Sequence, residues 1–223
     1  MTKVIDDIKQ TETDIKLSAA RTKLVLDNPF LGTLILQLPL KLASDDWCKT
    51  IATDAKYLYY NPEYIESLSL SETQFVLSHE VLHCGLSHMS RRQHRNKTKW
   101  DIACDYAVNG LLVKEDLTAP KGILYQEEFD GMPAEEIYPC IEDNDDSELL
   151  DEHIYDQNNE GSSSDTNSKS KNGSEKSEQN ETAANSKPEP LNAQEKSDLS
   201  TQWQKRMAAA AQRKTDIRRK DHC

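Results

Sequence analysis

The sequence has few aromatic residues, no long apolar run and no excess of positive charge. Aromatic residues make up 6% of its 223 residues, and no stretch approaches the ~20 apolar residues that span a membrane. The N-terminus, MTKVIDDIKQTETDIK, is charged and of mixed sign, so it is not expected to be a secretory signal. Lys and Arg total 27 against 39 Asp and Glu, a net charge of −12. A general nucleic-acid binder would need a broad basic surface and is therefore disfavoured.

Cysteine is also scarce. The five cysteines are odd in number and irregularly spaced, which does not suggest a disulfide framework. We therefore expect reduced thiols and a cytoplasmic protein without membrane contact.

The acidity is concentrated in one part of the chain. Residues 142–196 hold 15 acidic against 5 basic residues and are rich in Ser and Asn, so their burial is not expected to offset the entropy of ordering them. Residues 197–223 are helix-prone but have no evident packing partner. The composition thus predicts a folded domain over 1–141, a disordered acidic linker over 142–196 and a helical tail over 197–223.

Local patterns predict the elements of the folded part. The Asn28-Pro29 pair should end a first helix, Pro39 favours an edge position or the end of a strand, and Asn61-Pro62 should open a short helix. Ser71 and Gln74 fit a capping box at the start of another helix. The predicted elements are helices over 3–27, 62–68, 71–90 and 99–113, and strands over 31–42 and 50–60.

One predicted helix carries a metal-binding motif. His79-Glu80-Val81-Leu82-His83 fits H-E-x-x-H, and helical spacing places the two imidazoles about 40° apart on successive turns. Two such rings can hold one Zn²⁺ ion, which makes His79 and His83 the expected metal ligands. Glu80 lies beside them and can accept a proton from a metal-activated water, as a general base. A hydrogen-bonded histidine pair in the core is the alternative.

A catalytic zinc site needs a third protein ligand. Asp101, Asp105 and Asn109 share one face of the predicted 99–113 helix, and we favour Asp105 because it is central on that face. Asp101 could instead stabilise the start of the helix, while Asn109 is either an orienting group or a plain polar residue. His88 would lie about 140° from His83 on a continuous helix, so only a break at Gly85 could bring it back.

These residues resemble a known family. The run HEVLHCGLSHMSRR, followed by KWDIACDYAVN, is similar to the predicted metallopeptidase domain of bacterial and phage VWA-like proteins. TDAKYLYYNP and GILYQEEFDGMPAEEIY resemble segments that flank these motifs in the family, and the resemblance spans about residues 20–141. Two features depart from the family pattern: Ala55 stands where the family has Gly, and we do not expect the von Willebrand factor A-like domain into which members of the family usually continue.

The resemblance implies the ligands His79, His83 and Asp105, with Glu80 as the base. We therefore expect an α+β, zincin-like fold, in which a small sheet packs on helices and the metal lies between the motif helix and the 99–113 helix. The expected function is zinc-dependent hydrolysis of peptide bonds in a protein or peptide substrate. The alternative is a non-catalytic, zinc-stabilised interaction module that works with a MoxR-type ATPase or a VWA-domain protein, as the resemblance suggests.

Overall fold

The computed structural model describes residues 2–142, 149–154 and 187–220. Most of the expected linker therefore lies outside the described residues. The helices are α1 (Thr2–Asp27), α2 (Pro29–Ile35), α3 (Pro62–Ser67), α4 (Leu70–Gly85), α5 (His88–Arg91), α6 (Lys97–Lys114), α7 (Ala134–Ile137) and α8 (Ala193–Lys220), with short 3-10 turns at Glu127–Phe129 and Tyr138–Cys140. The strands are β1 (Leu40–Leu42), β2 (Ile51–Thr53), β3 (Leu58–Tyr60) and β4 (Glu152–His153). The fold is α+β, as expected.

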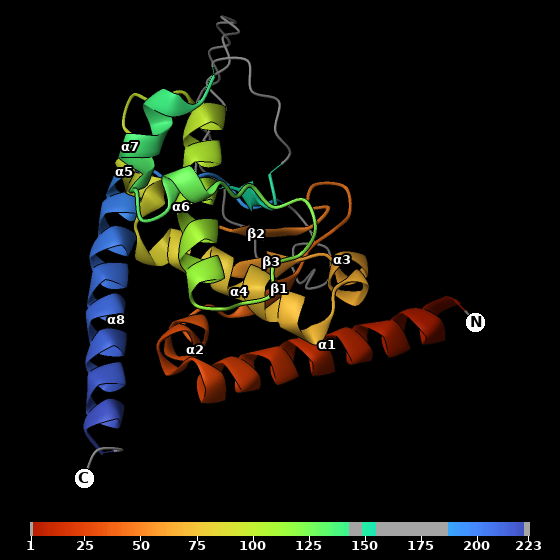
Figure 1. Cartoon of the computed structure of the whole chain (residues 1–223). Coiled ribbons are helices and arrows are strands. Elements are labelled where there is room, and N and C mark those ends of the chain that lie inside the picture. The colour runs from red at the N-terminus through yellow and green to blue at the C-terminus, as the bar shows by residue number, and fades with distance from the viewer. Residues whose placement is uncertain (1, 143–148, 155–186, 221–223) are drawn as a thin grey trace, which may run out of the picture.

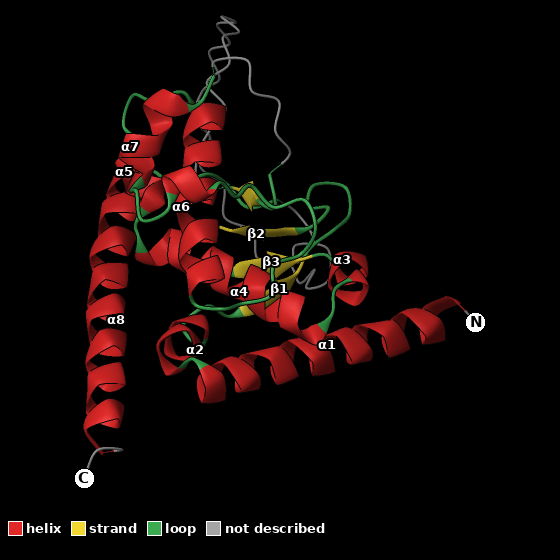
Figure 2. Ribbon diagram, viewed as in Figure 1, coloured by secondary structure: helices red, strands yellow, loops and turns green. Residues whose placement is uncertain are grey.

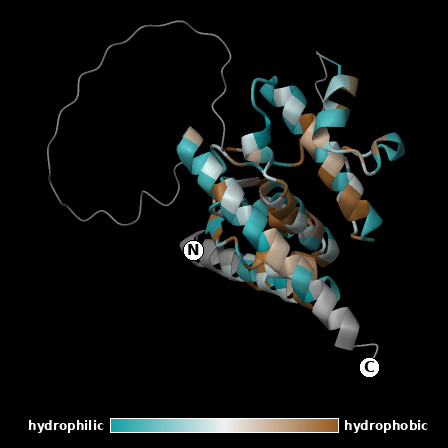
Figure 3. Cartoon of the chain, turned by 90° about the vertical axis from the view of Figure 1, so that its left-hand side faces the viewer, coloured by the Kyte–Doolittle hydropathy of each residue, from teal (hydrophilic) through white to brown (hydrophobic). Residues whose placement is uncertain are grey.

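Helix α4 lies at the centre of the molecule. It contacts α1, α2, α6 and α8, and it also contacts strand β2. Figure 1 shows α1 running along the base and α8 along one side, with α4 between them. Figure 2 shows that helices surround a small sheet, and Figure 3 shows that apolar residues gather where these helices meet. The motif helix is thus enclosed by its neighbours.

The sheet has the strand order β1-β3-β2-β4. Strand β3 is parallel to β1 and antiparallel to β2, and β4 pairs with β2 in parallel. The single strand expected over 50–60 is in fact two strands joined by a turn. In that turn the Asp54 carboxylate accepts hydrogen bonds from the backbone N–H groups of Lys56 and Tyr57 at 2.8 and 2.7 Å. Ala55 adopts a left-handed φ of 64°, the conformation that favours Gly at this position.

The expectation of a strand over residues 31–42 was largely wrong. Residues 29–35 form helix α2, with Asn28 as N-cap and Pro29 in the first turn, and only 40–42 form a strand. Leu31, Leu34 and Ile35 are buried at helical spacing. A Cβ on Gly32 would lie 2.4 Å from the Cα of Val25, so glycine permits the close approach of α1 and α2.

Helix α4 begins and ends at other residues than expected. The capping box is Ser69 with Glu72: the Ser69 side chain accepts from the Glu72 backbone N–H, and the Glu72 carboxylate accepts from that of Ser69. The sequence offers two overlapping capping patterns, and the earlier one is used. At its other end α4 stops at Gly85, and Ser87 has a left-handed φ of 57° before α5 begins. The helix expected over 71–90 is therefore broken.

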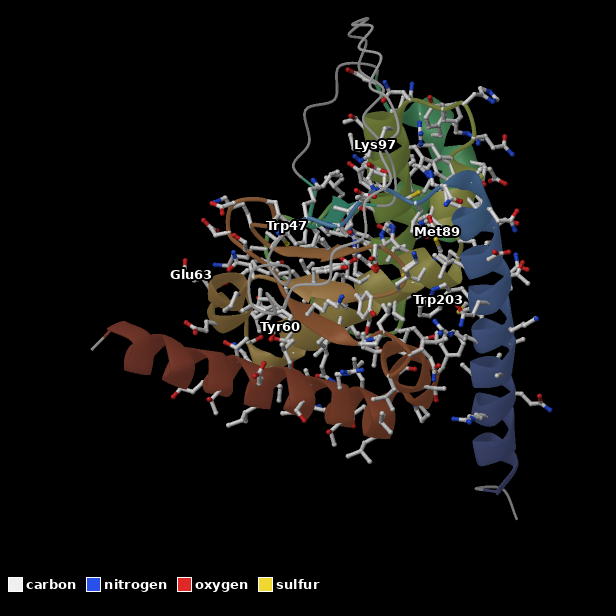
Figure 4. The ribbon with its side chains drawn as sticks, turned by 180° about the vertical axis from the view of Figure 1, so that it is seen from behind. Trp47, Tyr60, Glu63, Met89, Lys97 and Trp203 are labelled. Carbon is white, nitrogen blue, oxygen red and sulfur yellow. The ribbon has the colours of Figure 1, made fainter. Side chains whose placement is uncertain are left out.

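Helix α8 packs on the domain, although its sequence suggested no partner. Trp203 is completely buried, and its indole N–H donates a 2.9 Å hydrogen bond to the carbonyl oxygen of Ala55. Figure 4 shows Trp203 on α8 beside the body of the domain. Lys56 also forms an ion pair with Glu195 at 2.7 Å. The turn between β2 and β3 thus supplies a docking site that local composition could not reveal.

Parts of the expected linker also pack on the domain. Ile154 is 3% exposed in a small cluster with Ala52 and Tyr59, and Leu191 joins the main core. The composition of 142–196 as a whole conceals these short apolar segments. Within the described part of the chain, no helix has both the length and the apolar character needed to cross a bilayer.

Candidate metal centre

Helices α4 and α6 bring the three expected ligands together. Nε2 of His83 lies 3.5 Å from Oδ1 of Asp105, and Nε2 of His79 lies 3.7 Å from the same oxygen. Their ligand atoms all fall within 4.8 Å of one another. All three side chains are fully buried. The helical spacing of the histidines and the central place of Asp105 on α6 thus produce one compact group.

The donor set fits a metal ion. A tetrahedral zinc ion with bonds of 2.0–2.1 Å holds its ligand atoms about 3.3–3.4 Å apart. The observed separations of 3.5 and 3.7 Å exceed that value by only a few tenths of an ångström. Two imidazole nitrogens and one carboxylate oxygen are also ligand types that zinc prefers.

Asn109 orients the His79 ring. Its Oδ1 lies 2.9 Å from Nδ1 of His79, while its Nδ2 donates to the Leu124 carbonyl oxygen at 2.9 Å. The second contact identifies which end of the amide faces the histidine. Because Oδ1 can only accept, Nδ1 of His79 carries the proton, and Nε2 keeps the electron pair that a metal would need.

His88 contacts the His83 ring. The break after Gly85 returns His88 to this side of the helix, where its Nδ1 lies 3.2 Å from Nδ1 of His83. The contact is on the ring nitrogen opposite the one that faces Asp105. His88 is therefore not one of the three clustered ligands. A proton on Nδ1 of His83 would leave its Nε2 for the metal, as for His79.

Glu80 lies beside the histidines in a strongly acidic setting. It forms a second close group with His79 and Asp151, in which Oδ1 of Asp151 is 3.6 Å from Nε2 of His79. Burial, followed by the nearby Asp151 charge, raises the pKa of the Glu80 carboxyl well above its ordinary value. Burial and Glu80 likewise raise the pKa of the Tyr64 hydroxyl, which therefore stays protonated. The site thus combines a proton acceptor of raised pKa with candidate metal ligands.

The other candidate ligand on α6 has a different role. Asp101 forms an ion pair with Lys97 at 2.6 Å and is not in either close group of the described residues.

On α4, Cys84 faces strand β2, where its Sγ lies 3.6 Å from Oγ1 of Thr53. Burial raises the pKa of this thiol to about 12. Cys84 therefore remains a protonated thiol that joins α4 to the sheet.

Sequence reasoning missed Asp151 altogether. This residue lies inside the stretch expected to be disordered, yet it is 4% exposed and contacts the centre. The local signal was the short apolar pattern of Leu149, Leu150 and Ile154 around it. Acidic and polar residues on both sides of this pattern concealed it.

The fold and these buried groups define an α+β protein whose centre joins two histidines and three carboxylates, a donor set that can hold a metal ion. A family model described as "Putative metallopeptidase domain" matches residues 12–221, and the chain belongs to this family. The match extends beyond the 20–141 of the sequence resemblance and includes α8. Comparison with curated proteins and with solved structures gave no match.

Proposed function

We propose that the protein is a zinc-dependent peptidase with a zincin-like centre. His79, His83 and Asp105 would hold the ion, and Glu80 would be the general base. The observation that carries the proposal is the close approach of both Nε2 atoms to one Asp105 oxygen, with Glu80 beside them. The family to which the chain belongs supports a metal ion and a protein or peptide substrate.

The metal ion and the protein side chains would carry out different parts of the hydrolysis. A zinc ion bound at this site would supply Lewis acidity, which polarises a peptide carbonyl and acidifies a water molecule. Glu80 would take a proton from the attacking water and deliver it to the leaving amine as the C–N bond breaks. Asn109 and His88 would hold the two imidazoles in the ligand tautomer and orientation.

A non-catalytic zinc-stabilised module is the second candidate, and one observation favours it. The side chains of His79, Glu80, His83 and Asp105 are all 0% exposed, and Asp151 adds a further carboxylate beside them. Structural zinc sites are closed in this way, whereas catalytic sites keep a position for substrate. Such a module would act through a partner, for which a MoxR-type ATPase or a VWA-domain protein is the candidate.

Metal analysis and one substitution distinguish these possibilities. We expect the purified full chain to contain zinc that is lost in His79→Ala but retained in His94→Ala, because His94 is exposed and lies in neither close group of the described residues. Glu80→Gln should keep the zinc and lose cleavage of a peptide library, while Glu63→Gln, which changes an exposed carboxylate on α3, should retain both. Equal zinc in wild type and His79→Ala would refute the metal centre. Bound zinc without any cleavage would favour the structural module.

A further inference from the structure

Residues 149–154 form a short strap across one edge of the sheet. Within the strap, β4 pairs with β2 in parallel, with Ala52 opposite Glu152 and Thr53 opposite His153. The pairing continues as the backbone N–H of Ile154 donates to the carbonyl oxygen of Thr53 at 3.4 Å. Strand β3 already occupies the other edge of β2. The strap therefore covers the edge of β2 that the rest of the sheet leaves open.

Apolar side chains fix the strap at both of its ends. Leu149 and Leu150 pack against two different core clusters, and Ile154 is buried in a third, with Ala52 and Tyr59. Strand β2 in turn contacts α4, the helix that carries the motif. The strap is thus held beside the metal centre by packing that does not involve the metal ligands.

Asp151 extends from this strap into the centre. Its carboxylate is 3.6 Å from Nε2 of His79 and lies within the same close group as Glu80. A water molecule that is activated by the metal and deprotonated by Glu80 must lie next to His79 and Glu80. Asp151 therefore places an anionic oxygen close to the position that the attacking water needs.

We infer that the strap is a self-inhibitory segment that occupies the substrate position of the centre. This inference rests on the proposed function. An extended peptide can bind an open sheet edge through main-chain hydrogen bonds. Strand β4 already pairs with the main chain of β2 at this edge. Because the histidines, Glu80 and Asp105 are 0% exposed, a substrate reaches them only when the covering residues move. Peptide and strap would compete for one sheet edge and one coordination position.

The test uses a small metal-directed probe with the zinc-loaded full chain. Acetohydroxamic acid binds at an open zinc position, and its dissociation constant is measured by calorimetry. We expect Asp151→Asn, which removes the anionic ligand, and Ile154→Ala, which loosens the strap remotely, to bind it more tightly than wild type. The affinity for the probe should rise about tenfold if the wild-type strap is open about a tenth of the time. Asp198→Asn, an exposed carboxylate on α8, should match wild type.

The results distinguish a failure of the strap inference from a failure of the proposed function. Equal affinities for the probe in all four zinc-loaded proteins would overturn the inference while leaving the metal centre intact. A loss of zinc affinity in Asp151→Asn as large as in Asp105→Ala would also overturn it, since Asp151 would then be a permanent ligand. Absence of zinc from the wild type would refute the proposed function, and the strap inference would fail with it.

Discussion

The side-chain oxygen of Asn109 lies 2.9 Å from Nδ1 of His79, on the side of the ring opposite Asp105. One helix, α6, thus contributes both the carboxylate that faces the histidine ligand atoms and the amide that orients one of the rings. Their spacing of four residues places them on one face of α6. Because the two groups are carried by the same rigid element, the ring and the third ligand are positioned together.

Asn109→Ala should weaken zinc binding without unfolding the protein. Loss of an orienting hydrogen bond behind a ligand histidine typically costs 10–100-fold in metal affinity, and we expect a loss of about that size. Asn109→Asp should restore much of it, because a carboxylate also accepts from Nδ1. Zinc titration against a chromophoric chelator measures both variants. An unchanged affinity in Asn109→Ala would show that the contact does not orient the ligand.

Asp105→Ala should cost more zinc affinity than His88→Ala. The first removes an oxygen that lies 3.5–3.7 Å from both Nε2 atoms, and we expect a loss of more than about 100-fold. The second removes only a group behind His83, for which about tenfold is expected. The same chelator competition ranks the two. The reverse order would reassign the centre to a three-histidine type with His88 as a ligand.

Glu80→Gln should stabilise the metal-free protein at neutral pH. Burial raises the pKa of Glu80 in the folded state above its ordinary value of 4.5. The folded state therefore binds the Glu80 proton more tightly than the unfolded state. The stability that Glu80 contributes is fully present below its ordinary pKa and is lost as pH rises through the folded pKa. Gln cannot ionise, so the free energy of unfolding of Glu80→Gln should rise relative to that of wild type, by at most about 1.4 kcal/mol per pH unit.

Urea unfolding in the presence of a chelator measures this difference between pH 5 and pH 8. Glu63→Gln, which changes an exposed carboxylate, is the control and should follow the wild type. A constant difference between Glu80→Gln and wild type across this range would mean that burial does not disfavour the Glu80 charge.

Trp203→Ala should destabilise the whole domain. Trp203 is completely buried, and its indole bonds to the turn at Ala55, so we expect a loss of about 3–5 kcal/mol in the free energy of unfolding. Trp203→Phe should lose less, because it retains an aromatic ring and gives up the hydrogen bond. Gln204→Ala, on the exposed face of α8, is the matched control. A wild-type unfolding transition in Trp203→Ala would show that α8 folds apart from the domain.

Local spacing in the sequence was enough to find the motif helix and the helix after it. The pattern His79-Glu80-x-x-His83 determines the relative positions of three side chains because a single α-helix has fixed geometry. The preference for Asp105 used the same reasoning on α6, and the structure places this residue beside both histidines. The Asn61-Pro62 start of α3 and the end of α1 before Pro29 were also confirmed. These features all depend on residues close together in the chain.

Tertiary structure decided the remaining features, because they depend on contacts between distant segments. Helix α2 lies so close to α1 at Gly32 that a Cβ there would meet the Val25 backbone, a contact that the apolar pattern of 31–42 does not specify. His88 reaches His83 through a backbone break that the motif itself does not encode. Asp151 lies 72 positions after His79 in the numbering. The pairing of β4 with β2 and the packing of the apolar residues around it bring it to the centre. The sequence by itself determined which side chains lie together on one helix, because helical geometry fixes their spacing. Tertiary packing decided which other groups surround them, because no local pattern specifies contacts between distant segments.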